Sequence, residues 1–361
     1  MSVSTDQVMG LLSTLVDPHT GLDMVTGKQV KKVDLNGKKL DLQILLGYPA
    51  AGYHATLKEQ IMAHLGAGLN LEAIRIDIQT AILSHAVQKN LKPLAGVKNI
   101  IAVASGKGGV GKSTTAVNLA LALHADGART GLLDADIYGP SQPLMLGVKG
   151  KPDTDGKSIY PLQAHGLQSM SIGYLVDEET PMIWRGPMVT GALQQLLRDT
   201  RWDQLDYLIM DLPPGTGDIQ LTLAQQVPVS GAVIVTTPQD IALLDARRGL
   251  HMFEKVSVPV LGIVENMSLH VCSRCGHTEP LFGEGGGQRM AEQCGVPLLG
   301  ALPLDINIRL NADNGHPSVV AEPDGDIARH YFSIARAMSA RLAQKARDFS
   351  HRFPTISVVN D

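Results

Sequence analysis

The sequence predicts an α/β protein with a doubly wound, mostly parallel sheet, preceded by a small α+β domain. From residue 100 onward, short apolar runs that suit buried parallel strands alternate with stretches of helical periodicity. Before residue 95, helical stretches instead accompany strands in which apolar and polar residues alternate. The Pro- and Gly-containing stretch 91–99 separates the two patterns, so we expect domains at residues 1–95 and 96–361.

The expected elements follow from these patterns. In the first domain we expect helices at 6–15 and 56–65 and strands at 39–46 and 73–79. In the second we expect strands at 100–104, 130–133, 207–210, 232–236, 260–264 and 298–302, and helices at 113–125, 187–199, 218–226, 240–255 and 326–348. Strands that alternate with helices place the sheet between two helical layers. Ligands of such sheets bind beyond the carboxyl ends of the strands, so the loops there should carry the chemistry.

Composition narrows the class of protein. The chain has 361 residues and a net charge of about −4, which gives no global sign of a nucleic-acid or anionic-membrane partner. No apolar run approaches the roughly 18–20 residues of a membrane span, and the first residues lack the basic and apolar regions of a signal peptide. Three cysteines do not form a disulfide framework. We therefore expect a soluble, cytoplasmic protein.

The stretch ASGKGGVGKST (104–114) matches the phosphate-loop spacing G-x-x-x-x-G-K-[ST] between an expected strand and an expected helix. Its glycines let backbone N–H groups turn around an anion, and the helix N-terminus adds partial positive charge. Lys112 is expected to contact the β- and γ-phosphates, and the Ser113 hydroxyl to bind Mg²⁺. The nucleotide-binding residues expected here are Gly106, Lys107, Gly108, Gly109, Val110, Gly111, Lys112, Ser113 and Thr114. The spacing does not call for Lys107, which is either a solvated bystander or a contact to another phosphate.

Carboxylates follow two further expected strands. Asp134 and Asp136 come after the strand at 130–133, and Asp211 directly follows 207–210. An acidic residue beside a phosphate loop can hold the magnesium shell and respond to the γ-phosphate. The glycines of PPGTG (213–217) would allow this segment to act as a mobile switch. Each aspartate taken alone could instead be a helix cap or a turn former.

The base is expected to be adenine. Guanine sites usually show Asn-Lys-x-Asp, whereas Asn266 is followed by Met267 and has Leu269 in place of the aspartate. Asn266 can still hydrogen-bond an adenine edge. The alternative is an asparagine that only forms a turn.

Cys272 and Cys275 form a C-x-x-C motif in a polar segment after the expected strand at 260–264, which favours metal or cluster binding. A buried pair or a thioredoxin-like redox pair fits the setting less well. One chain does not complete a four-thiolate site, because Cys294 lies in an expected helix and suits a small buried hydrophobe. His277 is a weak alternative ligand.

The loop GKGGVGKST, with its early lysine, resembles the deviant Walker A motif of the MinD/ParA/nitrogenase-iron-protein class of dimeric ATPases. The resemblance implies a homodimer in which Lys107 crosses the two-fold interface to the nucleotide of the other subunit. It also implies that Asp136 orients the attacking water, so that Lys107, Lys112, Asp136 and Asp211 form the expected catalytic set. Such a dimer brings two C-x-x-C pairs together and supplies four thiolates.

The blocks SGKGGVGKST, DADIYGPS, DLPPGTGD and ENMS followed by C-x-x-C resemble, in order, the Mrp/ApbC family of iron–sulfur cluster carrier ATPases. This resemblance implies ATP, Mg²⁺ and a labile 4Fe–4S cluster, with a cluster-assembly scaffold and apo iron–sulfur proteins as partners. The N-terminal residues resemble the small iron–sulfur-assembly-associated domain often fused to these ATPases. Relatives of that domain often carry a cysteine where this chain has GYPAAG (47–52), so we expect it to supply no cluster ligand.

Three alternatives remain from the sequence. A MinD/ParA-like positioning ATPase would want a basic amphipathic C-terminal helix or a basic DNA-binding face, whereas the C-terminal stretch mixes acidic and basic residues. An electron-transferring reductase of the nitrogenase type would use single cysteines far apart in sequence. A zinc-bridged regulatory dimer has the same thiolate requirement as a cluster carrier.

Overall fold

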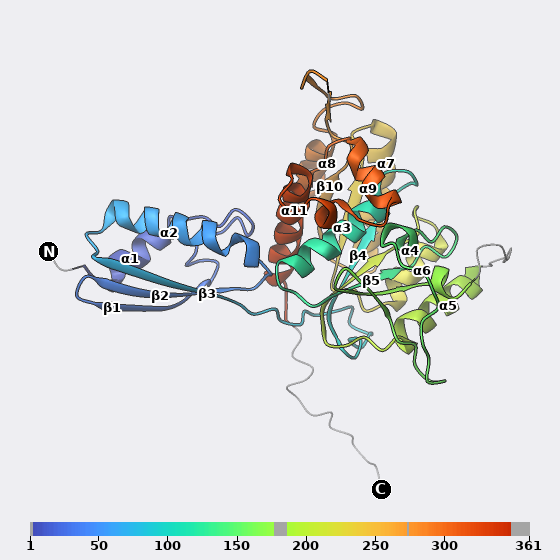
Figure 1. The fold of residues 1–361 in the computed structure, drawn as a ribbon, viewed down its shortest axis with the longest axis horizontal. Coiled ribbons are helices and arrows are strands. Elements are labelled where there is room, and N and C mark those ends of the chain that lie inside the picture. The colour runs from blue at the N-terminus through green and yellow to red at the C-terminus, as the bar shows by residue number, and fades with distance from the viewer. Residues whose placement is uncertain (1–2, 177–185, 273, 348–361) are drawn as a thin grey trace, which may run out of the picture.

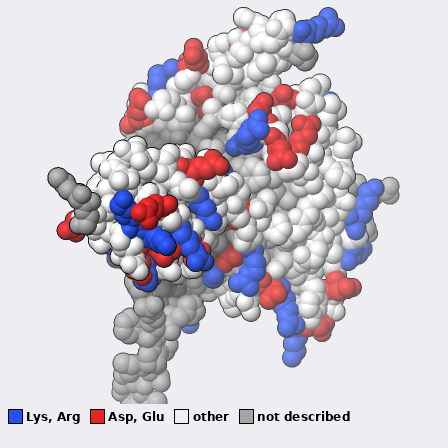
Figure 2. Space-filling model, turned by 60° about the vertical axis from the view of Figure 1, so that its left-hand side comes forward, with Lys and Arg blue, Asp and Glu red and all other residues white. Residues whose placement is uncertain are grey.

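The computed structural model describes residues 3–176, 186–272 and 274–347. The last residue of the expected helix 326–348 lies outside this part of the chain. Within the part that is described, no helix is long and apolar enough to cross a membrane. Acidic and basic side chains are interspersed on the face shown in Figure 2, so that face carries no extended patch of one charge.

An eight-stranded sheet forms the centre of the larger domain (Figure 1). Its order is β13-β10-β9-β4-β8-β5-β7-β6, and the strand pairs are parallel except for the β6–β7 pair at one edge. The strands are β4 (Val97–Ala104), β5 (Thr130–Asp134), β6 (Leu162–Ala164), β7 (Leu167–Ser171), β8 (Leu205–Asp211), β9 (Gly231–Thr236), β10 (Val260–Glu265) and β13 (Leu298–Ala301). The predicted doubly wound, mostly parallel sheet is confirmed.

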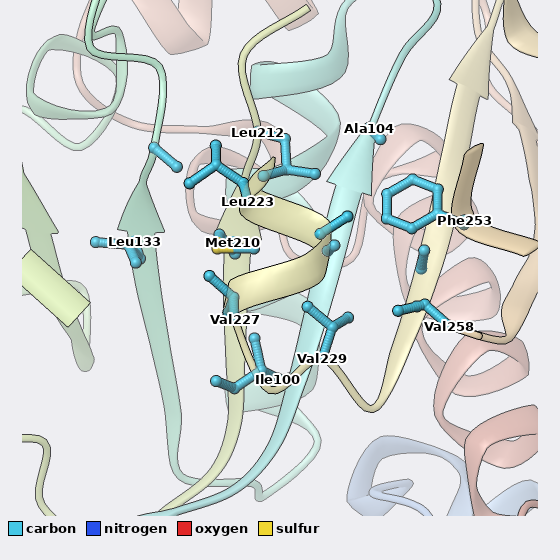
Figure 3. Packing of buried hydrophobic residues seen from close by; sticks show 14 of the residues in the cluster. Ile100, Ala104, Leu133, Met210, Leu212, Leu223, Val227, Val229, Phe253 and Val258 are labelled. Atoms are coloured by element: carbon cyan, nitrogen blue, oxygen red, sulfur yellow. The ribbon is translucent and has the colours of Figure 1, made fainter. Parts of the chain in front are cut away.

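Helices cover both faces of this sheet. Successive residues of a strand point to opposite faces, so a run of consecutive apolar residues is buried only when each face is covered. Ile100, Ala102 and Ala104 of β4 belong to one apolar cluster, part of which Figure 3 shows with Leu223 of α6 and Phe253 of α7. Ile101 and Val103 belong to a second cluster, built against α3 and α11. The helices are α3 (Lys112–Ala125), α4 (Gln142–Met145), α5 (Gly186–Asp199), α6 (Asp218–Gln226), α7 (Asp240–Lys255), α8 (Gly286–Cys294), α9 (Ile306–Asp313), α10 (Ser318–Ala321) and α11 (Asp326–Ala343).

The small N-terminal domain has its own sheet and core, on the left of Figure 1. Its elements are α1 (Thr5–Leu12), β1 (Val30–Asn36), β2 (Lys39–Leu46), α2 (His54–Gly68) and β3 (Ala73–Thr80). Strand β2 pairs antiparallel with β1 and parallel with β3. Alternate residues of β2 are buried, which is the pattern of a sheet with one solvent-facing side.

A buried carboxylate of the larger domain contacts the small domain. Arg336 of α11 donates to both carboxylate oxygens of Asp126, at 2.7 and 3.0 Å. Asp126, at the end of α3, also accepts the backbone N–H of Gly52 at 2.9 Å. Ala340 of α11 is fully buried in the core of the small domain. Helix α11 therefore packs on the sheet of one domain and contributes to the core of the other.

The connecting segment 82–90, here called the strap, runs along the larger domain. Its Gln88 side chain donates to the carbonyls of Ala224 and Val227 at the end of α6, at 2.8 and 3.1 Å. The His85 ring contacts Asn99 of β4 at 2.9 Å. The expected linker 91–99 is therefore wrong in its last residues, because β4 already begins at Val97. The boundary between residues 95 and 96 stays a prediction.

Candidate functional site

The loops after β4, β8 and β5 meet at one edge of the sheet because these three strands are parallel neighbours. The phosphate loop connects β4 to α3. Asp211 is the last residue of β8 and lies opposite Val103 of β4 on one side and Asp134 of β5 on the other. Sheet topology thus brings Lys112, Asp134 and Asp211, which are far apart in the sequence, to the same place.

The glycines of the loop are required by its geometry. Gly109 and Gly111 have φ of +80° and +81°, a region that favours glycine. At Gly106 the limit is space, because a Cβ atom would lie 2.1 Å from the carbonyl carbon of Asp245 in α7. The loop therefore adopts its anion-binding shape only with glycine at these positions, and α7 lies directly against its entrance.

Lys112 is buried and forms an ion pair with the fully buried Asp211. Its ammonium also contacts the Ser113 hydroxyl at 3.2 Å. The Gln142 side chain closes this network, since its amide donates to Asp211 at 2.8 Å and to the Ser113 carbonyl at 3.0 Å. Ser113 Oγ and Asp211 contact the same ammonium, and both are oxygen donors of the type that Mg²⁺ prefers.

Asp134 is fully buried at the end of β5, next to Asp211. Burial and the Asp211 charge raise the pKa of Asp134 to about 7, against the effect of the backbone N–H groups of Gln142 and Asp136 that it accepts. Asp136 is half-buried, and burial raises its pKa as well. A raised pKa makes a carboxylate a better proton acceptor, and of the two aspartates only Asp136 is partly exposed.

Lys107 stands apart from this network. Its backbone carbonyl accepts the Ser105 hydroxyl at 2.8 Å, while none of the described carboxylates forms an ion pair with its ammonium. The Ser105 carbonyl in turn accepts the N–H of Gly215 at 2.9 Å, which ties the segment 213–217 to the entrance of the phosphate loop. The structure of one chain thus leaves the Lys107 ammonium available to another group.

Asn266 follows β10 and lies against the phosphate loop. Its side-chain amide donates to the Val110 carbonyl at 2.9 Å and accepts the N–H of Met267 at 2.9 Å. One amide hydrogen and one lone pair remain for a base edge. Base recognition by Asn266 therefore stays a prediction, while its contact with the loop is an additional role that spacing in the sequence did not indicate.

The cysteine pair lies in a small hairpin between β10 and α8, formed by β11 (His270–Val271) and β12 (Thr278–Glu279). Cys272 donates its N–H to the His277 carbonyl and accepts the N–H of Gly276 at its own carbonyl, each at 2.8 Å. Cys275 is exposed and Cys272 partly so. Backbone N–H groups of Arg274 and Cys275 lower the pKa of Cys272, which favours the thiolate that binds metals.

Within the described residues, no three potential metal ligands of one chain come together. Cys294 ends the helix α8, as expected, and packs against the core. Each chain therefore offers the pair Cys272 and Cys275 as two thiolates, and the hairpin that carries them extends beyond the large sheet, above α8 in Figure 1.

Comparison with known proteins decides the family. Residues 96–339 match the model of the NUBPL iron-transfer P-loop NTPases. The chain belongs to this family. Residues 5–78 match a second model, that of an iron–sulfur cluster assembly protein, so the resemblance of the small domain is confirmed as well.

Curated relatives agree over most of the chain. It is 50% identical to the iron-sulfur cluster carrier protein of Escherichia coli strain K12 over 337 residues, which is 93% of this chain and 91% of the relative. It is 48% identical to the iron-sulfur cluster transfer protein NUBPL of Mus musculus over 299 residues, 81% and 93% of the two chains. Among solved structures, a nucleotide-binding protein from Archaeoglobus fulgidus in complex with ADP is 37% identical, with a TM-score of 0.57 over 64% of this chain and 90% of that one.

Family membership makes this chain a P-loop NTPase of the iron–sulfur cluster carrier group. The structure places the expected nucleotide residues around one loop and the expected cysteines on one hairpin. The sequence did not indicate Gln142, because a glutamine in a short helix belongs to no motif. Its contact with Asp211 forms only when β5 and β8 lie side by side. The individual roles of the site residues remain predictions.

Proposed function

We propose that this protein is a cytoplasmic, ATP-hydrolysing homodimer that carries a labile 4Fe–4S cluster as its cargo. It would receive the cluster from an assembly scaffold and pass it to apo iron–sulfur proteins. The observation that carries the proposal is the cysteine pair on a hairpin, with Cys275 exposed and Cys272 partly so, in a chain whose described residues bring no three potential metal ligands together. Four thiolates, the usual ligand set of a cubane cluster, then require two chains.

ATP would act on the buried Lys112–Asp211 pair. The β- and γ-phosphates are the stronger partner for the lysine, because they carry more charge than one carboxylate. When Lys112 turns to the phosphates, Asp211 loses its cation and the following segment 213–217 loses the ion pair that holds its start in place. Ser113 and Asp211 would then hold Mg²⁺, which would supply charge neutralisation at the phosphates. The ion pair thus provides a nucleotide-dependent change at the switch.

Hydrolysis would use Asp136 and Lys107. Asp136 is half-buried with a raised pKa, which suits the orientation of an attacking water. Lys107 would reach the phosphates of the other subunit, as the deviant Walker A resemblance implies. A lysine charge in a desolvated interface stabilises developing phosphate charge more strongly than one in water.

Iron and sulfide analysis of anaerobically purified protein tests the cargo. We expect about four irons and four sulfides per dimer, with visible absorption that disappears when Cys272 and Cys275 are both replaced by Ser. The matched control is Cys294→Ser, which should keep the cluster because Cys294 packs against the core. ATP binding should survive in both variants. Retention of full iron by the double variant, or zinc in place of iron and sulfide, would contradict the proposal.

Mixing two inactive variants tests the shared nucleotide site. Lys107→Ala and Lys112→Ala should each abolish hydrolysis. In a mixed dimer, one phosphate loop is intact and faces a subunit that still has Lys107, so part of the activity should return. If exchange of subunits is demonstrated and no mixture recovers hydrolysis, Lys107 does not act across the interface.

A further inference from the structure

Asn266 connects two parts of the molecule that the proposed function needs to communicate. Its side chain lies on the phosphate loop, where it donates to the Val110 carbonyl at 2.9 Å. Its backbone is the residue after β10, and its N–H donates to the Thr236 carbonyl of β9 at 2.7 Å. Cys272 follows six residues later. The same residue therefore touches the nucleotide loop and begins the segment that carries the cysteine pair.

The contact with the loop is close and specific. A Cβ atom at Gly111 would lie 2.1 Å from Nδ2 of Asn266, so the glycine is needed for the amide to reach its position. Val110 is itself buried, which leaves its carbonyl dependent on a protein donor. A change in the backbone of residues 110–111 on phosphate binding therefore acts on the Asn266 side chain directly.

The segment between Asn266 and the cysteines transmits position because it is held at several points. Met267 has φ of +56°, and its N–H donates to Asn266 Oδ1 at 2.9 Å. Ser268 donates its N–H and its hydroxyl to the Leu302 carbonyl, each at 2.9 Å. His270 then pairs with Leu304 in a parallel bridge. These contacts order the backbone between Asn266 and the hairpin, so that a shift of Asn266 would displace the segment as far as Cys272.

We propose that Asn266 is a positioning residue that couples the state of the phosphate loop to the accessibility of Cys272 and Cys275. This inference rests on the proposed function for its purpose, since the coupling would let nucleotide control loading and release of the cluster. It goes beyond base recognition, because the decisive hydrogen bond is made to the loop backbone and not to the nucleotide. Its effect can be measured on the protein without any cluster.

The experiment measures alkylation of each cysteine by iodoacetamide in the full-length apo-protein, with and without saturating MgADP, resolved by mass spectrometry. Cys294 serves as the internal reference thiol. In the wild type we expect MgADP to change the alkylation rate of the Cys272–Cys275 pair at least about fivefold, the lower end of usual coupling between sites. Light scattering in the same buffers ensures that samples of equal oligomeric state are compared.

Two variants separate the loop contact from the local turn. Asn266→Asp keeps an acceptor for the Met267 N–H and loses the donor to Val110, and Asn266→Ala loses both. Both should abolish the MgADP effect on alkylation at full nucleotide occupancy. The matched control is Asn118→Ala, which removes another buried asparagine that bonds the Thr114 carbonyl and the Val319 N–H and does not touch the hairpin. It should keep the effect.

Three results would overturn the inference: a wild type whose cysteines do not respond to MgADP, an Asn266→Asp variant that responds fully, or complete loss of MgADP binding in that variant, which would make Asn266 a nucleotide contact alone. None of these results bears on whether the cysteines hold a cluster. Iron and sulfide analysis decides that separately, so failure of the coupling and failure of the proposed function remain distinguishable.

Discussion

Lys112 illustrates what a motif alone does not say about a residue. Its place in G-x-x-x-x-G-K-[ST] predicts a phosphate contact. Because the loop lies at the surface end of a strand, the sequence also predicts that loss of Lys112 leaves the fold intact. In the structure it is instead 5% exposed and paired with the fully buried Asp211. Removing one partner of a buried pair leaves an uncompensated charge, which costs about 3–5 kcal/mol.

We therefore expect Lys112→Ala to abolish ATP hydrolysis and also to lower the free energy of unfolding by about 3 kcal/mol. The double variant Lys112→Ala with Asp211→Asn removes the unpaired charge, so it should regain most of that stability and none of the activity. Denaturant unfolding and a phosphate-release assay on the three proteins check this. Equal stability of Lys112→Ala and the wild type would show that the buried pair contributes nothing.

Asp134 makes stability depend on pH in an unusual direction. Its pKa is about 7 in the folded protein, against an ordinary value of 3.8. As the pH rises from about 4 to about 7, the unfolded chain loses this proton while the folded chain keeps it, so Asp134 lowers the free energy of unfolding across that window and has no further effect above it. The neutral carboxyl therefore makes its full contribution to the free energy of unfolding only below about pH 4.

Replacing Asp134 with Asn should remove this dependence. Relative to the wild type, the variant should gain stability between about pH 4 and pH 7, measured by denaturant unfolding without nucleotide or Mg²⁺. Titrating groups that do not interact with Asp134 cancel in the difference between the two proteins, whereas Asp211 loses a neighbouring carboxylate in the variant. A difference that stays constant over this range would mean that Asp134 ionises with an ordinary pKa.

Other residues of the site were beyond sequence reasoning for a physical reason. The phosphate loop and the C-x-x-C pair are local motifs, so spacing reveals them. The Gln142 contact with Asp211 and the Asn266 contact with Val110 join residues 69 and 156 positions apart. Only the parallel order of the strands brings such pairs together, and no local pattern encodes that order.

At the scale of elements, the strands buried on both faces could be predicted from the sequence, and the more polar strands could not. Strands β4, β8, β9 and β10 are nearly continuous apolar runs, since both of their faces are covered, and each was expected within a few residues of its observed bounds. Strands β1, β6 and β7 and the cysteine hairpin were not expected. Strands β1 and β6 lie at the edges of their sheets, and they, β7 and the hairpin contain polar residues that weaken the apolar signal.

The strap shows where a boundary drawn from composition departs from contacts. Residues 82–90 precede the expected boundary, yet Gln88 and His85 bond to α6 and β4 of the larger domain. A chain that begins at Ala81 should therefore be more stable than one that begins at Leu91, by about 1–2 kcal/mol from the lost hydrogen bonds. Both should hydrolyse ATP, because neither lacks a residue of the nucleotide site.

Thermal and denaturant unfolding of the two shortened proteins, with their rates of hydrolysis, check this expectation. The full-length chain is the reference. Equal stability would show that the strap is a passive linker. Loss of hydrolysis in both shortened proteins would instead show that the small domain takes part in the nucleotide reaction, against the expectation that it serves docking or regulation.

At the scale of the whole molecule, the chain presents half of two sites. Its cysteine pair provides two of the four thiolates that a cubane cluster needs, and its Lys107 ammonium has no ion-pair partner among the described carboxylates. A two-fold dimer completes both sites with one symmetry operation. The small domain contacts the larger one through the Gly52–Asp126 hydrogen bond and through Ala340 of α11, and it supplies no thiol.

Native mass spectrometry of anaerobically purified protein tests this central claim most directly. We expect a dimer whose mass exceeds that of two chains by one 4Fe–4S cluster, and we expect the Cys272→Ser, Cys275→Ser protein to lack that added mass. A monomer that carries a whole cluster, or a dimer that carries two, would contradict a cargo shared between the subunits.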